Sequence, residues 1–143
     1  MLKQISVFVE NRRGKLAEIT EILAKNDIDL RALSLSDTSE FGLLRLIASK
    51  PDKAFEVLKE AGMMVRVNEV VAVGVTDMPG AFAKASKLIA DVGVNLEYLY
   101  ALSSRNNNEA VIIMRLDQPG EGLTALRNGG FRIIGPDEIY NEK

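Results

Sequence analysis

The sequence lacks both cysteine and histidine over its 143 residues. Without them the chain forms no disulfide, offers no thiolate nucleophile and has no zinc site of the usual cysteine and histidine type. It also lacks the side chain that most often acts as a general acid or base, although Asp, Glu and Lys remain. We therefore predict that the protein is not an enzyme and that it uses no metal ion or cofactor.

An excess of basic charge and a long apolar run are missing as well. The 18 Lys and Arg residues against 20 Asp and Glu give a net charge of −2, whereas nucleic-acid-binding proteins usually carry a basic face. No apolar segment approaches the roughly 20 residues of a membrane helix. The N-terminal segment MLKQISVFVE has neither the apolar stretch nor the cleavage site of a signal peptide. We therefore expect a cytoplasmic protein with no nucleic-acid or membrane partner.

The sequence does contain one pattern of strands and helices twice. Each copy begins with a period-two strand pattern, which is followed by Gly14 or Gly80 and then by a helical pattern. Two more strand patterns, a second helix that begins at Pro51 or Pro119, and a short last strand complete each copy. The strands are expected at 4–10, 28–35, 43–49 and 63–67 in the first copy and at 70–76, 94–102, 110–116 and 131–134 in the second.

The repeated order β-α-β-β-α-β predicts an α+β protein made of two ferredoxin-like repeats with antiparallel sheets. We place the first domain at 1–68 and the second at 69–143. Because the stretch 67–71 leaves almost no linker, we expect the copies to pack side by side as one rigid body. The tail GPDEIYNEK at 135–143 follows the last expected strand and is interpreted as a surface extension.

The segment VTDMPGAF at 75–82 marks a change from a strand pattern to a helical one. Local geometry is one explanation, in which Asp77 caps the turn, Pro79 presets φ in the first helical turn and Gly80 permits a tight backbone. Ligand binding is the other, because a helix start attracts a carboxylate and a glycine lets a ligand approach the backbone. A nearby Asp or Asn oxygen accepts from an ammonium group, so these groups together suit the two ends of a free amino acid.

Both copies resemble the ACT domain, a small ligand-binding module of amino-acid metabolism. The matching segments are DMPGAF with GVNLEYL in the second copy and ENRRGKL with DIDLRAL in the first, and the two copies cover nearly the whole chain. The resemblance implies two ACT-type repeats and the allosteric or sensory binding of an amino acid at an interface between paired domains. It implies a regulatory protein that modulates a separate metabolic enzyme; the alternative is a regulatory or structural subunit that binds no ligand.

The resemblance also implies which residues contact the ligand. In the family, the residue three before the loop glycine and the residue fifteen after it commonly contact the ligand from two different domains. The candidates in this chain are Asn11, Arg12, Gly14 and Asp29 in the first copy and Asp77, Pro79, Gly80, Asn95 and Leu96 in the second. The first copy departs from the family pattern because Arg13 stands where a proline is usual, which makes its loop less preorganised.

Charge favours one of the two sites that these candidates form. If the copies pair through their second strands, Asn11 meets Asn95 and Asp77 meets Asp29. The first site is neutral with Arg12 nearby and suits both ends of an amino acid, whereas the two carboxylates of the second repel an anion. We therefore predict that the amino acid binds between Asn11 and Asn95. Because exposed edge strands commonly pair, we also expect a homodimer.

Overall fold

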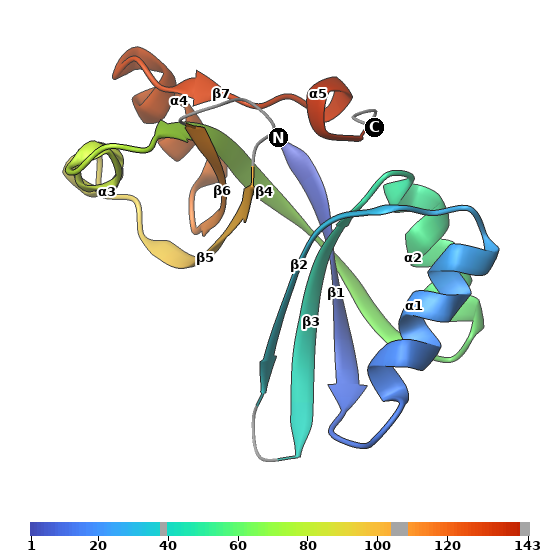
Figure 1. Cartoon of the computed structure of the whole chain (residues 1–143). Helices are drawn as coiled ribbons and strands as arrows, with labels where there is room; N and C mark the ends of the chain where they lie inside the picture. Colours follow the sequence, from blue (N-terminus) through green and yellow to red (C-terminus); the bar gives the residue numbers. More distant parts are fainter. Residues whose placement is uncertain (38–39, 104–108, 141–143) are drawn as a thin grey trace. The chain divides into compact units, whose positions relative to one another are not determined.

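The structure, a computed structural model, describes residues 1–37, 40–103 and 109–140 (Figure 1). The chain divides into two compact units. The first unit consists of Lys3–Asn68 together with the end of the chain from Ile139, and the second consists of Met1–Leu2 with Glu69–Glu138. Each unit carries one copy of the repeat.

The first unit has the order of elements that the sequence predicts. Its elements are β1 (Leu2–Glu10), α1 (Lys15–Lys25), β2 (Leu30–Asp37), β3 (Phe41–Ala48), α2 (Pro51–Glu60) and the beginning of β4 (Met64–Thr76). The second unit repeats this order with the remainder of β4, α3 (Ala81–Asp91), β5 (Leu96–Ser103), β6 (Glu109–Leu116), α4 (Pro119–Asn128) and β7 (Arg132–Ile133). The α+β fold with two βαββαβ repeats is therefore confirmed.

The second helix of each unit begins and ends as its sequence indicates. Pro51 and Pro119 are the first residues of α2 and α4, where the missing N–H of proline has no partner to lose. Gly62 and Gly130 lie just beyond the two helices with φ of 86° and 92°. This left-handed conformation ends a helix at little steric cost only when the residue is glycine.

One difference from the expected strands concerns β4. The sequence predicts separate strands at 63–67 and 70–76, but a single strand of 13 residues runs from Met64 to Thr76. The intervening Asn68 and Glu69 continue the extended backbone because no glycine or proline interrupts the stretch 67–71.

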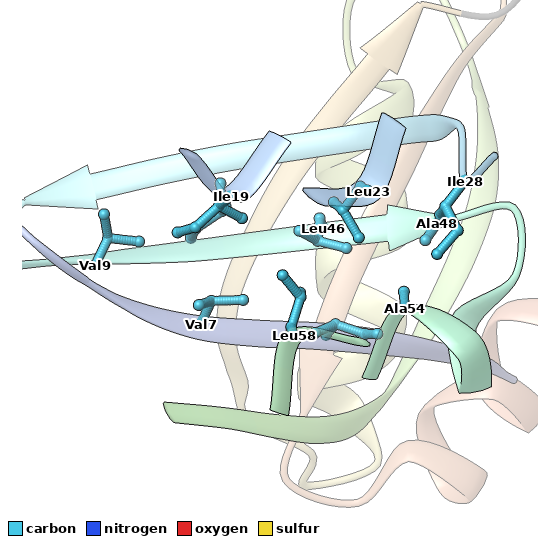
Figure 2. Close-up of a cluster of buried hydrophobic side chains, with 11 residues drawn as sticks. Val7, Val9, Ile19, Leu23, Ile28, Leu46, Ala48, Ala54 and Leu58 are labelled. Carbon is cyan, nitrogen blue, oxygen red and sulfur yellow. The ribbon is translucent and has the colours of Figure 1, made fainter. Parts of the chain in front are cut away.

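The sheet of the first unit is antiparallel, with β3 between β1 and β2. Ile5 lies opposite Leu46 and Val7 opposite Leu44, so alternate residues of neighbouring strands share one face. Helices α1 and α2 cover this face (Figure 1), and burial of the apolar side chains between helices and sheet is the main stabilising force. The buried core comprises Ile5, Val7, Val9, Ile19, Leu23, Ile28, Leu44, Leu46, Ala48, Ala54 and Leu58, of which most are labelled in Figure 2.

The sheet of the second unit repeats this arrangement, with β6 between β4 and β5. The short strand β7 pairs with β4 at Val73 and Gly74, and in the described part of the second unit it does not extend along the last residues of β4. Helices α3 and α4 cover the apolar face. The buried core comprises Val71, Val73, Val75, Ala85, Ile89, Val94, Ile112, Met114, Leu116 and Leu126.

The tail after β7 is a second difference, because it is not simply a surface extension. It forms a short helix, α5 (Pro136–Tyr140), in which Ile139 is only 3% exposed. The N–H of Lys3 donates to the Tyr140 hydroxyl at 2.8 Å, and this hydroxyl donates to the carbonyl of Lys3 at 3.3 Å. Arg31 donates to the backbone carbonyl of Tyr140 at 3.1 Å. Ile139 and Tyr140 are therefore packed and hydrogen-bonded within the first unit.

The contact between Tyr140 and β1 predicts a pH-dependent contribution to stability. Burial raises the pKa of Tyr140 above its ordinary value of 10.0, so the contribution is fully present below pH 10 and is lost as the hydroxyl ionises at higher pH. Tyr140→Phe should lower the free energy of unfolding by about 1 kcal/mol near neutral pH, and the difference should shrink above pH 10. Urea unfolding of both proteins from pH 7 to pH 11 measures it; a constant difference would contradict the role of the hydroxyl.

Candidate ligand-binding site

The first helix of each unit begins directly after a glycine in the left-handed conformation. Gly14 precedes α1 with φ of 84°, and Gly80 precedes α3 with φ of 87°, a conformation that L side chains rarely adopt. No described side chain caps the first turn of either helix. Unsatisfied N–H groups and the partial positive charge at each helix start are therefore open to a ligand or to water.

The two loops also share a tight turn just after the strand. The N–H of Arg12 donates to the carbonyl of Glu10, and the N–H of Met78 donates to the carbonyl of Thr76, both at 2.8 Å. A hydrogen bond between residues two apart defines a γ-turn, and its central residues here are Asn11 and Asp77. Both side chains are exposed, and neither has a hydrogen bond or ion pair to a described residue. The turn therefore presents one unpaired polar side chain beside each helix start.

The local roles predicted for Asp77 and Pro79 are wrong. Gly80 occupies the N-cap position of α3, and no side-chain oxygen accepts a hydrogen bond there. Pro79 precedes the cap and lies outside the first helical turn, which begins at Ala81. The γ-turn at Asp77 leaves three residues between this carboxylate and the helix, so it does not cap the helix and remains available for another partner.

Arg12 is held within its own loop. Its guanidinium lies 3.1 Å from the carboxylate of Glu10 and 3.8 Å from that of Glu18, and Lys15 also approaches Glu18 at 3.5 Å. The Arg12 side chain is 54% exposed, and exposed ion pairs of this kind are individually weak. A ligand carboxylate can therefore compete for Arg12, although the charge of the loop is already largely compensated.

The two residues that precede the second strands are held by equivalent backbone contacts. The Ser49 hydroxyl accepts from the N–H of Asp29, and the Asp117 carboxylate accepts from the N–H of Asn95, both at 2.9 Å. The side chains differ, because the Asp29 carboxylate pairs with Arg31 at 2.9 Å, whereas the Asn95 amide has no partner among the described residues. The negative charge expected at Asp29 is thus compensated within its own unit.

The structure does not bring the candidates of one unit together. Asn11 follows β1 at the end where Glu10 lies opposite Phe41, whereas Asp29 precedes β2 at the end where Leu30 lies opposite Ala48. The length of β2 separates them. In the second unit, β5 separates Asp77 from Asn95 in the same way, because Thr76 pairs with Glu109 and Leu96 with Leu116. A site with both kinds of residue therefore needs two units.

Leu96, a predicted ligand contact, lies at the start of β5 with a partly buried side chain. Its side chain packs against the apolar core of the second unit, because the strand alternation turns it toward the helices. Three other leucines on the same type of strand have partly exposed side chains: Leu33, Leu35 and Leu99 are 50%, 48% and 40% exposed. In the described residues β2 pairs only with β3 and β5 only with β6, so these leucines lie on open sheet edges, where another chain can pair.

The structure also shows a cavity of about 400 Å³ in the second unit, which the sequence did not indicate. It lies beside the α3 start, and its lining includes Thr76, Pro79, Lys84, Glu109 and Arg132. Hydrogen bonds from Arg132 to Glu109 and Glu138 raise the pKa of Arg132 above its ordinary value, so the guanidinium stays charged. A comparison of the two copies could have located this site. The positions of Glu109 and Arg132 carry uncharged residues in the first copy.

Two classes of feature are missing from the described part of the chain. It contains no group of three or more Asp or Glu residues arranged to hold a metal ion. None of its helices has the length and apolar character needed to cross a membrane.

Comparisons with known proteins agree with the doubled fold. A family model described as an ACT domain pair matches residues 1–128. Protein BT0572 from Bacteroides thetaiotaomicron is 35% identical, with a TM-score of 0.92 over 99% of this chain and 96% of that one. A search of curated protein sequences finds no match.

More distant structures share the fold alone. The regulatory subunit of aspartate kinase from Thermus thermophilus is 18% identical, with a TM-score of 0.65 over 90% of this chain and 92% of that one. The corresponding subunit from Thermus flavus is 17% identical, with a TM-score of 0.62 over 89% and 91%.

Proposed function

This chain belongs to the family of ACT domain pairs, and we propose that it is a regulatory protein that binds a free amino acid between paired ACT domains. The observation that carries the proposal is the exposed amide of Asn11, which has no side-chain partner among the described residues and lies at the centre of a γ-turn beside the open start of α1. The helix start and Arg12 suit the carboxylate of an amino acid, and the amide oxygen suits its ammonium group.

Asn95 is the second contact that we propose, from the unit that pairs with the first. Its amide is exposed and has no partner among the described residues, while its backbone is fixed by Asp117. The two amides of the site between Asn11 and Asn95 are therefore uncharged, and Arg12 adds a positive charge beside them. At the other proposed pair, Asp77 has no partner among the residues that the structure describes and Asp29 is compensated by Arg31, so this site favours an ammonium group over a carboxylate.

We propose that the units pair through the open edges of β2 and β5 in a homodimer. The exposed leucines Leu33, Leu35 and Leu99 support this assembly, because apolar side chains on a free strand edge are stabilised when another strand covers them. Antiparallel pairing of two such edges brings the γ-turn of one unit toward the start of the second strand of the other, which is what a shared site requires.

We further propose that binding of the amino acid changes the activity of a separate enzyme of amino-acid metabolism. The chain has the fold of aspartate kinase regulatory subunits from two Thermus species, and those proteins are named for such a role. The second candidate function is a subunit that binds no ligand. Such a subunit would pair through the same edges of β2 and β5, but both proposed sites would stay empty.

A thermal-shift screen of the full chain against the standard amino acids tests the proposal. A ligand that binds only the folded state raises the melting temperature, and about 2.7 kcal/mol of stabilisation is expected at a concentration 100 times the Kd. One amino acid, or a small chemically related group, should therefore raise the melting temperature in a concentration-dependent way. The absence of a shift with every amino acid, combined with co-purification of an enzyme, would favour the ligand-free subunit.

A further inference from the structure

The lining of the cavity in the second unit does not include Asn11, Arg12 or Asn95, the residues proposed to hold the amino acid. Its walls come from the end of β4, the loop before α3, the start of β6 and the connection between α4 and β7. The volume of about 400 Å³ lies in the range of small-molecule sites. All lining residues belong to the second unit, so the cavity is complete within it.

Lys84 contributes a positive charge to the wall of the cavity. Its ammonium group lies 5.8 Å from the centre of the Phe131 ring, and no carboxylate among the described residues pairs with it. The other lysine of the same helix, Lys87, is instead bound to Asp91 at 3.2 Å. A cation over an aromatic ring at the wall of a cavity is well placed to bind an anion that enters it.

The remaining charges in the cavity wall are already fixed by the protein. Arg132 pairs with Glu109 and, at 2.6 Å, with Glu138. Gly74 provides the space for this arrangement, since a Cβ atom there would lie 2.6 Å from the carboxylate of Glu109. Lys84 is therefore the charged group of the wall that remains for a ligand.

The first copy has different residues at the three charged positions of the cavity wall. The fourth residue of its helix is Glu18 in place of Lys84, and Glu18 is bound by Arg12 and Lys15. Phe41 and Met64 stand where the second copy has Glu109 and Arg132. The charges around this cavity are therefore specific to the sequence of the second copy and do not follow from the shared fold.

We propose that this cavity is a second binding site, which takes a small organic carboxylate. Lys84 pairs with the carboxylate, Phe131 and Pro79 contact its carbon atoms, and the Thr76 side chain offers a hydroxyl at the end of β4. Pro79, a candidate contact from the family resemblance, lines this cavity, whereas Asn11 and Asn95 do not. The cavity and the site between Asn11 and Asn95 would therefore give the protein two separate inputs.

Titration of the isotopically labelled full chain with succinate, and separately with L-aspartate, tests the site by NMR. Both probes carry carboxylates, and only L-aspartate carries an amino group. Binding in the cavity should shift the amide signals of Thr76, Gly129 and Gly130 with either probe. Lys84→Gln should raise the Kd about tenfold, and Lys84→Glu, which introduces the residue of the first copy, should abolish the shifts.

Lys87→Gln is the matched control on the same helix, and it should leave the Kd of both probes unchanged. Shifts of Asn11 and Asn95 without shifts of the cavity amides would overturn this proposal while supporting the interface site. Equal binding by the wild-type protein and Lys84→Gln, or no shift with either probe, would also overturn it. Asn11→Ala should not affect cavity binding, so the failure of one site is distinguishable from the failure of the other.

Discussion

Asn11→Ala is expected to weaken the binding of the amino acid found in the thermal-shift screen by roughly 10- to 100-fold. The reason is the loss of a hydrogen bond between the amide oxygen and the ammonium group, since bonds to charged groups are worth about 1.5–3 kcal/mol. Isothermal titration calorimetry of the full chain measures the change in Kd. The melting temperature without ligand should change little, because the Asn11 side chain is exposed and makes no described contact.

The companion variant Asn95→Ala should have an effect of similar size if the two amides hold one ligand from opposite sides. Asn128→Ala is a matched control, because Asn128 is an exposed residue at the end of α4 with no proposed role in this site. If both Asn11→Ala and Asn95→Ala bind the amino acid as tightly as the wild type, the proposed interface site is wrong. A loss of affinity in Asn11→Ala alone would place the ligand at the γ-turn without the second unit.

Gly122→Ala is expected to lower the free energy of unfolding by about 1–3 kcal/mol, although alanine normally stabilises a helix relative to glycine. Gly122 is the fourth residue of α4 and is buried. An added methyl group would overlap a methyl carbon of Leu116, and Leu116 is itself fully buried. The core must therefore shift to accept the extra carbon. Urea unfolding monitored by circular dichroism measures the loss.

The first unit indicates which second substitution should restore the stability that Gly122→Ala loses. At the equivalent positions it has Ala48 at the end of β3 and Ala54 in α2, both fully buried, so a small strand residue accompanies a larger helix residue. Leu116→Ala alone should cost about 2–5 kcal/mol, and the added Gly122→Ala should then be neutral or stabilising. This coupling of about 0.5–3 kcal/mol is what a double-mutant cycle detects.

Gly120→Ala provides the control in the same helix. No atom lies within 4 Å of a Cβ added at this position, so the substitution should be neutral or should stabilise the protein by up to about 1 kcal/mol. Strictly additive effects of Leu116→Ala and Gly122→Ala would contradict the packing account.

The doubled fold was predictable because single residues with strong backbone preferences mark its boundaries. Gly14 and Gly80 mark the starts of the first helices, and Pro51 and Pro119 mark those of the second helices. The continuity of β4 was not predicted, since strand patterns on either side of Asn68 look the same whether the chain turns or continues. The helix α5 escaped notice because five residues carry too little periodicity to be recognised.

The candidate site was predictable only in part, because side-chain pairing depends on tertiary contacts. The loops and their left-handed glycines follow from sequence. The exposed position of the Asp77 side chain does not, because it results from the γ-turn that closes between Thr76 and Met78. The pairing of Asp29 with Arg31 and the cavity around Lys84 require the spatial arrangement of residues, which periodicity does not reveal. The pairing of units at the interface remains a prediction.

Residues Met1–Leu2 and the residues from Ile139 each belong to the compact unit that carries the other copy of the repeat. This affects any attempt to produce the two units separately. Leu2 is almost fully buried and belongs with the second copy, whereas Ile139 and Tyr140 belong with the first. Proteolysis or gene truncation between Asn68 and Glu69 would therefore not yield two intact halves. Each fragment would lack a terminal segment that only the other carries, and mixing the two fragments should restore more native structure than either attains alone.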